Sequence, residues 1–184
     1  MTNAPPLSAA RRFARFALGS LRDLPAPVVD QAALLALDVL GSCLASSRQD
    51  FGHAIVQAAE RLGGPAESTL IGSKVKVGAS SAVLANSTLA HGLDFDDTRE
   101  DAIVHTGCVA VPTALAVGEA VDASGRAVLE AIVAGVEVMC RVGLAVPGRF
   151  HASARVSPRS SPTSRIGGSS RAISSWASSP WRPS

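Results

Sequence analysis

The sequence predicts an all-α protein with a bundle-like arrangement of helices, and two observations support this class. Among its 184 residues, 47% are hydrophobic but only 4% are aromatic, with Ala, Leu and Val dominating. Alanine and leucine form helices at little cost in free energy. Apolar residues also recur at helical spacing in six stretches, whereas one short stretch alternates. A chain of this length can bury one core, so we expect one folded domain over residues 1–150.

The first two predicted helices span residues 7–24 and 28–46. The first has an apolar stripe with arginines on the other side, which indicates an amphipathic helix rather than a targeting peptide. The second is apolar nearly all round and is predicted to be buried. Pro25 and Pro27 separate the two, because proline fits the first turn of a helix but disrupts its interior.

The next three predicted elements are a helix, an extended segment and a second helix. Residues 51–62 are amphipathic, and a Gly-Gly-Pro run ends that helix. Residues 69–77 alternate and are expected to form a short extended segment or hairpin. Residues 80–93 return to helical spacing. Small side chains in this stretch would let it lie deep in a bundle; they are Ala82, Ala85, Ser87 and Ala90.

The last two predicted helices follow an acidic connection. They span residues 108–120, with Pro112 near the start, and residues 128–146. A Ser-Gly turn lies between them, and Ser124 is a candidate N-cap because its hydroxyl can accept a bond from a free helical N–H.

The composition changes from Phe150 onward. Residues 151–184 are rich in Ser, Arg and Pro, contain no acid and show no periodicity, so they are predicted to form a disordered tail. All 15 acids lie at or before Glu137 with 10 basic residues, a net charge of −5. Seven arginines follow, which brings the whole chain to +2. The overall charge therefore describes neither part, and we expect no nucleic-acid partner.

Other function classes are excluded on simple grounds. No apolar run reaches the roughly 18 uncharged residues that a membrane span needs, so we expect no membrane partner. Cys43, Cys108 and Cys140 lack the spacing of metal ligands. They are predicted to be buried thiols in a reducing, cytoplasmic compartment. The sequence offers no closed ligand set, so we expect neither a metal nor another cofactor.

The segment 85–105 reads ANSTLAHGLDFDDTREDAIVH and holds two histidines, four aspartates and one glutamate. Alone, such a charge run is typical of a solvated helix end. Here His91 and His105 flank the acids, which favours a functional site. Phe95 is expected to pack this segment against the fold and leave the neighbouring acids facing elsewhere.

This segment resembles the MmgE/PrpD family, which includes 2-methylcitrate dehydratase and cis-aconitate decarboxylase. The matching motif is A-N-S-T-L-A-H-G-L-D-F-D-D-T at residues 85–98, followed by H-T-G at 105–107. GGPAESTLIG at 63–72 and SGRAVLEAIVAGVEVMCRVG at 124–143 agree as well. The resemblance covers roughly residues 8–150. It implies a larger, homodimeric enzyme that works without metal, in which a helical domain is joined to an α+β lid. Only the N-terminal part of that helical domain is present here.

The resemblance also implies roles for individual residues. Asp94 and Thr98 match the family's substrate-pocket acid and hydroxyl, and His105 matches its catalytic histidine. Removing water from a hydroxy-tricarboxylate needs a base beside a carboxylate and an acid for the leaving hydroxyl, and histidine serves as either near neutral pH. We therefore expect His105 to transfer protons, Asp94 to orient it or act as the base, and Thr98 to donate to the substrate. The default reaction is dehydration of 2-methylcitrate, with decarboxylation and epimerisation left open.

Three further polar residues of the segment are assigned to the fold. His91 is interpreted as a buried structural histidine, and Asp96 and Asp97 as capping or ion-pair acids.

His151 is the nearest in-frame candidate for a second histidine, which the family places in a Gly-Phe-His-Pro motif. Codons for residues 154–158, read one nucleotide later, can encode Arg-Gly-Phe-His-Pro. We therefore hypothesise a frameshift near residue 152, after which the lid and the closing helices are lost. Apolar faces of 28–46 and 128–146 would then lack partners.

Two other functional interpretations compete with this one. The chain is alternatively an inactive fragment or a non-catalytic interaction module. More remotely, DDTRED at residues 96–101 resembles the Mg²⁺-diphosphate motif of helical isoprenoid synthases. That chemistry needs a second acidic cluster to complete the Mg²⁺ site, and the sequence contains none.

Overall fold

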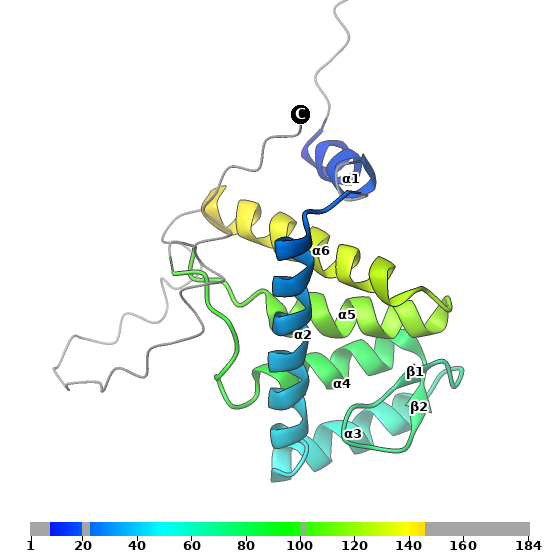
Figure 1. Cartoon of the computed structure of the whole chain (residues 1–184). Helices are drawn as coiled ribbons and strands as arrows, with labels where there is room; N and C mark the ends of the chain where they lie inside the picture. Colours follow the sequence, from blue (N-terminus) through cyan, green and yellow to red (C-terminus); the bar gives the residue numbers. More distant parts are fainter. Residues whose placement is uncertain (1–7, 20–22, 101, 146–184) are drawn as a thin grey trace, which may run out of the picture.

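The computed structural model describes residues 8–19, 23–100 and 102–145 (Figure 1). Within these ranges the predicted all-α class is confirmed. The elements are α1 (Ala9–Gly19), α2 (Ala26–Ser46), α3 (Asp50–Leu62), β1 (Ser68–Thr69), β2 (Lys76–Val77), α4 (Ala79–His91), α5 (Gly107–Ala120) and α6 (Gly125–Ala145). The described part of the first helix reaches Gly19, and Asp23 and Leu24, near its predicted end, are not helical.

Helices α3, α4, α5 and α6 form a stack, and α2 crosses three of them (Figure 1). Helix α4 lies inside this stack, in contact with α2, α3 and α5. The predicted deep position of α4 is confirmed, since Ala82, Ala85 and Ala90 are fully buried. Small side chains allow the neighbouring helices to approach α4 closely, so its middle is buried while His91 at its end stays exposed.

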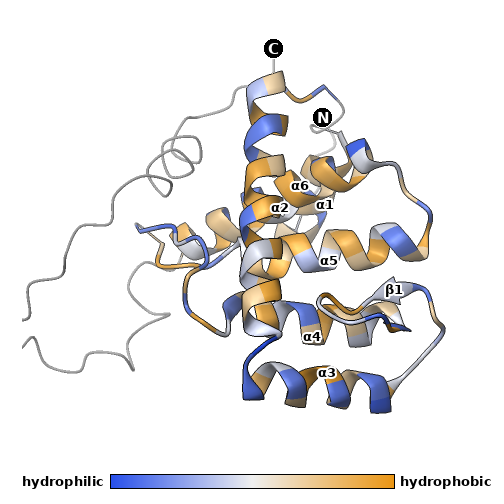
Figure 2. Ribbon diagram, turned by 60° about the horizontal axis from the view of Figure 1, so that its bottom comes forward, coloured by the Kyte–Doolittle hydropathy of each residue, from blue (hydrophilic) through white to orange (hydrophobic). Residues whose placement is uncertain are grey.

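Helix α2 is buried on one face, so the prediction of a buried helix holds for that face, while another apolar face is exposed. The buried face carries Val28, Ala32, Leu35, Val39 and Cys43, which belong to the main core. Leu34, Leu37 and Leu44 are exposed. In Figure 2 the hydrophobic colour covers much of α2 and α5, whereas α3 carries several hydrophilic residues. By length and composition α2 is also apolar enough to cross a membrane, but its buried face packs in the core of this fold.

The predicted hairpin is confirmed as two short antiparallel strands, with Ser68 opposite Val77. The side chain of Asn86 on α4 holds it in place. Its amide oxygen accepts the N–H of Ile71 at 2.9 Å, and its amide nitrogen donates to the carbonyl of Thr69 at 2.9 Å. Ser124 acts as the predicted N-cap of α6, because the N–H of Ala127 donates to its hydroxyl at 3.2 Å.

Candidate active site

The connection between α4 and α5, residues 92–106, is tied to the start of α5 by Asp97. This carboxylate accepts the hydroxyl of Thr106 at 2.7 Å and the N–H of Gly107 at 2.7 Å. The N–H groups at a helix start lack partners within the helix, so Asp97 satisfies them and its charge opposes the positive end of the helix. The interpretation of Asp97 as a capping acid is confirmed.

A backbone bridge also connects two residues within the later part of this connection. The N–H of Arg99 donates to the carbonyl of Val104 at 2.9 Å, which forms an isolated antiparallel bridge. Val104 and Ala102 lie against Gly143 of α6, where an added Cβ would come within 2.9 Å of Ala102. These contacts bring His105 back beside the start of the connection.

Asp96 lies between two histidines. Its side chain is fully buried, at 0% exposure. The Nδ1 atom of His91 lies 3.0 and 3.1 Å from the two carboxylate oxygens, and Nδ1 of His105 lies 3.4 Å from one of them. The two imidazole rings meet edge to face, with centroids 4.9 Å apart. Asp96 was predicted to be a capping or ion-pair acid, and the structure gives it both histidine rings as partners.

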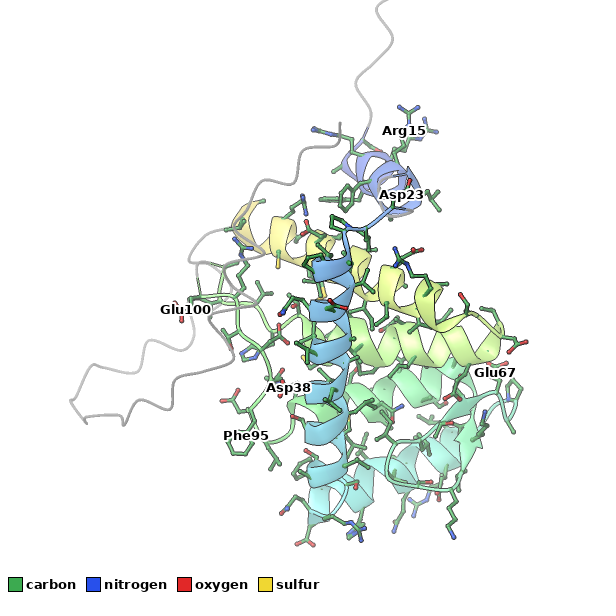
Figure 3. All side chains as sticks on the ribbon, in the orientation of Figure 1. Arg15, Asp23, Asp38, Glu67, Phe95 and Glu100 are labelled. Atoms are coloured by element: carbon green, nitrogen blue, oxygen red, sulfur yellow. The ribbon has the colours of Figure 1, made fainter. Side chains whose placement is uncertain are left out.

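Two expectations about this segment are wrong. The side chain of His91 is 52% exposed rather than buried. Phe95 is 79% exposed and projects away from the fold, while its neighbour Asp96 is buried (Figure 3). Alternation of side chains holds for extended backbone, but Asp94 adopts a left-handed conformation with φ of 56° and donates its N–H to the carbonyl of His91. This turn reverses which side chains face inward.

The predicted site residues come together. One ligand atom from each of His91, Asp94, Asp96 and His105 lies within 4.8 Å of the others. The hydroxyl of Thr98 lies 3.4 Å from Nδ1 of His105. Asp96 lies 3.4 Å from Nδ1 of His105 and so takes the orienting position that the sequence interpretation gave to Asp94. His151, the tail at 151–184 and the proposed frameshift lie outside the described residues.

Helices α2 and α5 contribute two groups that sequence reasoning missed. Burial raises the pKa of Asp38, and the negative charges of Asp97 and Asp96 raise it further. Burial also raises the pKa of Cys108, with a hydrogen bond to Asp96 as the next cause. Figure 3 labels Asp38 on the side of α2 that faces the connection. An acid in an otherwise apolar helix was the available signal for Asp38.

Comparison with known proteins identifies the family. The sequence model described as MmgE/PrpD N-terminal domain matches residues 11–167. The chain belongs to the MmgE/PrpD family. Cis-aconitate decarboxylase of Aspergillus terreus is 27% identical over 131 residues, which cover 68% of this chain and 27% of that protein. The same protein from Aspergillus terreus strain NIH 2624 / FGSC A1156 matches equally. The chain thus spans about a quarter of the length of these curated relatives.

The positions of Asp96 and Asp97 argue against the alternative interpretation as an isoprenoid synthase. In an isoprenoid synthase, Asp96 and Asp97 would both face a Mg²⁺-diphosphate group. Here Asp97 caps α5 and Asp96 is buried against the histidines, so the arrangement does not support that chemistry.

An apolar groove of about 440 Å³ lies between α5 and α6, away from the acids. Its lining has no titratable side chain, and Thr113 is the only residue with a polar side-chain atom among those that line it. A small carboxylic acid needs hydrogen-bond donors or positive charge, so this groove does not suit such a substrate.

Proposed function

We propose that this chain carries part of the proton-transfer site of an MmgE/PrpD lyase that acts on a small carboxylic acid. The observation that supports the proposal is the cluster at the end of α4, where Asp94, Thr98 and His105 gather around the buried Asp96. Dehydration of 2-methylcitrate, or of a similar hydroxy-tricarboxylate, is the first candidate reaction.

In the proposed mechanism His105 moves the proton. Its side chain is only 23% exposed, so substrate binding can shield it from water. Thr98, at 3.4 Å from Nδ1, donates a hydrogen bond to a substrate carboxylate or to the ring. Asp94 is exposed at the same place and acts as the base or as an orienting acid. Asp96 holds both rings and thereby determines which ring nitrogens remain for the substrate.

Decarboxylation of cis-aconitate is the second candidate reaction. The relatives at 27% identity carry that name, and both reactions require a proton to move at a carbon next to a carboxylate. The cluster supports either chemistry equally, since it supplies proton transfer and not the recognition of the whole substrate.

The test is to incubate the purified chain with 2-methylcitrate and with cis-aconitate and to follow the products by NMR. We expect turnover of one of them, which His105→Asn lowers by about 100-fold or more because it removes the proton-transfer group. His53→Asn, which changes an exposed histidine on α3, is expected to keep wild-type turnover.

A non-catalytic fragment or interaction module is the alternative function. Apolar Leu34, Leu37 and Leu44 of α2 are exposed, and exposed apolar side chains on one face favour an interaction surface. A cooperative thermal melt without turnover of either substrate would overturn the catalytic proposal and favour this alternative. A homodimer and a cytoplasmic location stay predictions, which sedimentation and cell fractionation check.

A further inference from the structure

We propose that His91, Asp94, Asp96 and His105 form a binding site for a divalent transition-metal ion of the Zn²⁺ type. The sequence shows no spacing typical of metal ligands here. The fold creates the set, because one ligand atom from each residue lies within 4.8 Å of the others.

The kinds of ligand atom select the ion. Imidazole nitrogen suits Zn²⁺ and its neighbours in the first transition row, whereas Mg²⁺ prefers oxygen ligands alone. Imidazole nitrogen and carboxylate oxygen are both ligand atoms that Zn²⁺ accepts. Mg²⁺ is therefore the expected non-binding control.

Part of the present geometry matches what the ion requires, and the ligand atoms that lie up to 4.8 Å apart would have to move closer. Ligand atoms about 2.1 Å from a tetrahedral Zn²⁺ are about 3.4 Å from one another. Nδ1 of His91 already lies 3.0 Å from Asp96, and Nδ1 of His105 lies 3.4 Å from it. Asp94 and His91 are exposed, so they can move to complete the site, and an ion can enter from the solvent side.

Charge balance favours an ion at this place. A divalent ion would lie beside the buried carboxylate of Asp96, and the nearby carboxylates of Asp38 and Asp97 add negative charge that attracts it. One divalent ion would offset this negative charge while it binds an unprotonated nitrogen of each ring.

The ion would bind the ring of His105 and the carboxylate of Asp94, the two groups to which the proposed function gives proton transfer. Metal binding and catalysis are therefore mutually exclusive, so that Zn²⁺ acts as an inhibitor. This consequence rests on the proposed function, whereas the binding itself does not.

Isothermal titration of the full chain with ZnCl₂, and separately with MgCl₂, tests the site. We expect one Zn²⁺ per chain and no heat of binding with Mg²⁺. His91→Gln and His105→Gln should each weaken Zn²⁺ binding by at least about 10-fold. His53→Gln removes an exposed histidine on α3 and should leave the affinity unchanged. Circular dichroism of each variant checks that it is folded.

Cobalt substitution of the wild-type chain gives a readout that needs no variant. Visible Co²⁺ absorption without a thiolate charge-transfer band is expected for nitrogen and oxygen ligands. Such a band would place the ion on a cysteine and overturn the proposal, as would the absence of Zn²⁺ binding or equal weakening by His53→Gln. Zn²⁺ binding without turnover would overturn only the proposed catalysis.

Discussion

Two polar clusters contact helix α4, and they differ in how completely they are closed. On the hairpin side, Asn86 is 2% exposed and bonds the backbone of Ile71 and Thr69. At the C-terminal end, Asp96 is equally buried, but its partners are titratable rings that reach solvent.

This difference indicates that the Asn86 cluster stabilises the fold, whereas the Asp96 cluster can bind a ligand or transfer a proton. The groups around Asn86 are neutral and pair with one another, so that cluster positions the hairpin and leaves no atom for a ligand. The cluster around Asp96 keeps ring nitrogens and the carboxylate of Asp94 accessible, which is what a proton-transfer or metal site requires. Four substitutions or titrations test this contrast.

The largest effect is expected from Asn86→Leu, which breaks the closed cluster. Leucine keeps the packing volume but leaves the N–H of Ile71 and the carbonyl of Thr69 without this partner. The free energy of unfolding should fall by roughly 2–4 kcal/mol, measured by urea denaturation. Gln57→Ala on the exposed face of α3 is the control and should change it by less than about 0.5 kcal/mol.

Gly107→Ala should disturb the connection that carries the open cluster. An added Cβ would overlap the Asp97 carboxylate and lie 2.9 Å from Leu35. We expect a loss of roughly 1–3 kcal/mol in the free energy of unfolding, together with weaker Zn²⁺ binding. Gly41→Ala meets no atom within 4 Å and should stabilise α2 by about 0.5–1 kcal/mol. Equal destabilisation by both changes would show that helix geometry, not the Asp97 contact, is responsible.

Raising the pH should lower the free energy of unfolding through Cys43, which belongs to the closed cluster. Its thiol lies 3.3 Å from the carbonyl of Asn86. Burial raises its pKa from 9.0 to about 12. The unfolded chain therefore loses its thiol proton first, and stability falls as the pH rises above 9.0. The decline should be about 1.4 kcal/mol per pH unit for this thiol.

Cys43→Ser removes this titration while it keeps a donor for the carbonyl of Asn86. Urea denaturation between about pH 8 and about pH 11 should give a shallower decline for this variant than for the wild type. Identical slopes would mean that the thiol ionises as easily in the folded chain as in the unfolded one.

The smallest effect on stability is expected from His91→Gln. The side chain is half exposed, glutamine can still donate to Asp96, and His105 remains beside that carboxylate. The free energy of unfolding should change by less than about 1 kcal/mol in urea denaturation. A loss as large as that from Asn86→Leu would make the open cluster a structural element instead.

The sequence by itself determined the helices, the hairpin, the Ser124 cap and the position of the acidic segment. These features follow from local spacing and from contacts between near neighbours, such as the bond from Ala127 to Ser124. The sequence motif at residues 85–98 also indicated the family, because it resembles the motif of the MmgE/PrpD proteins.

Only the tertiary structure decided which side chains of the segment face inward. The turn at Asp94 and the bonds from Asp97 to the start of α5 bury Asp96 and expose Phe95. Likewise, packing left one face of α2 exposed and brought Asp38 near the acids. Such outcomes depend on contacts between residues far apart in the chain. Local periodicity carries no information about them.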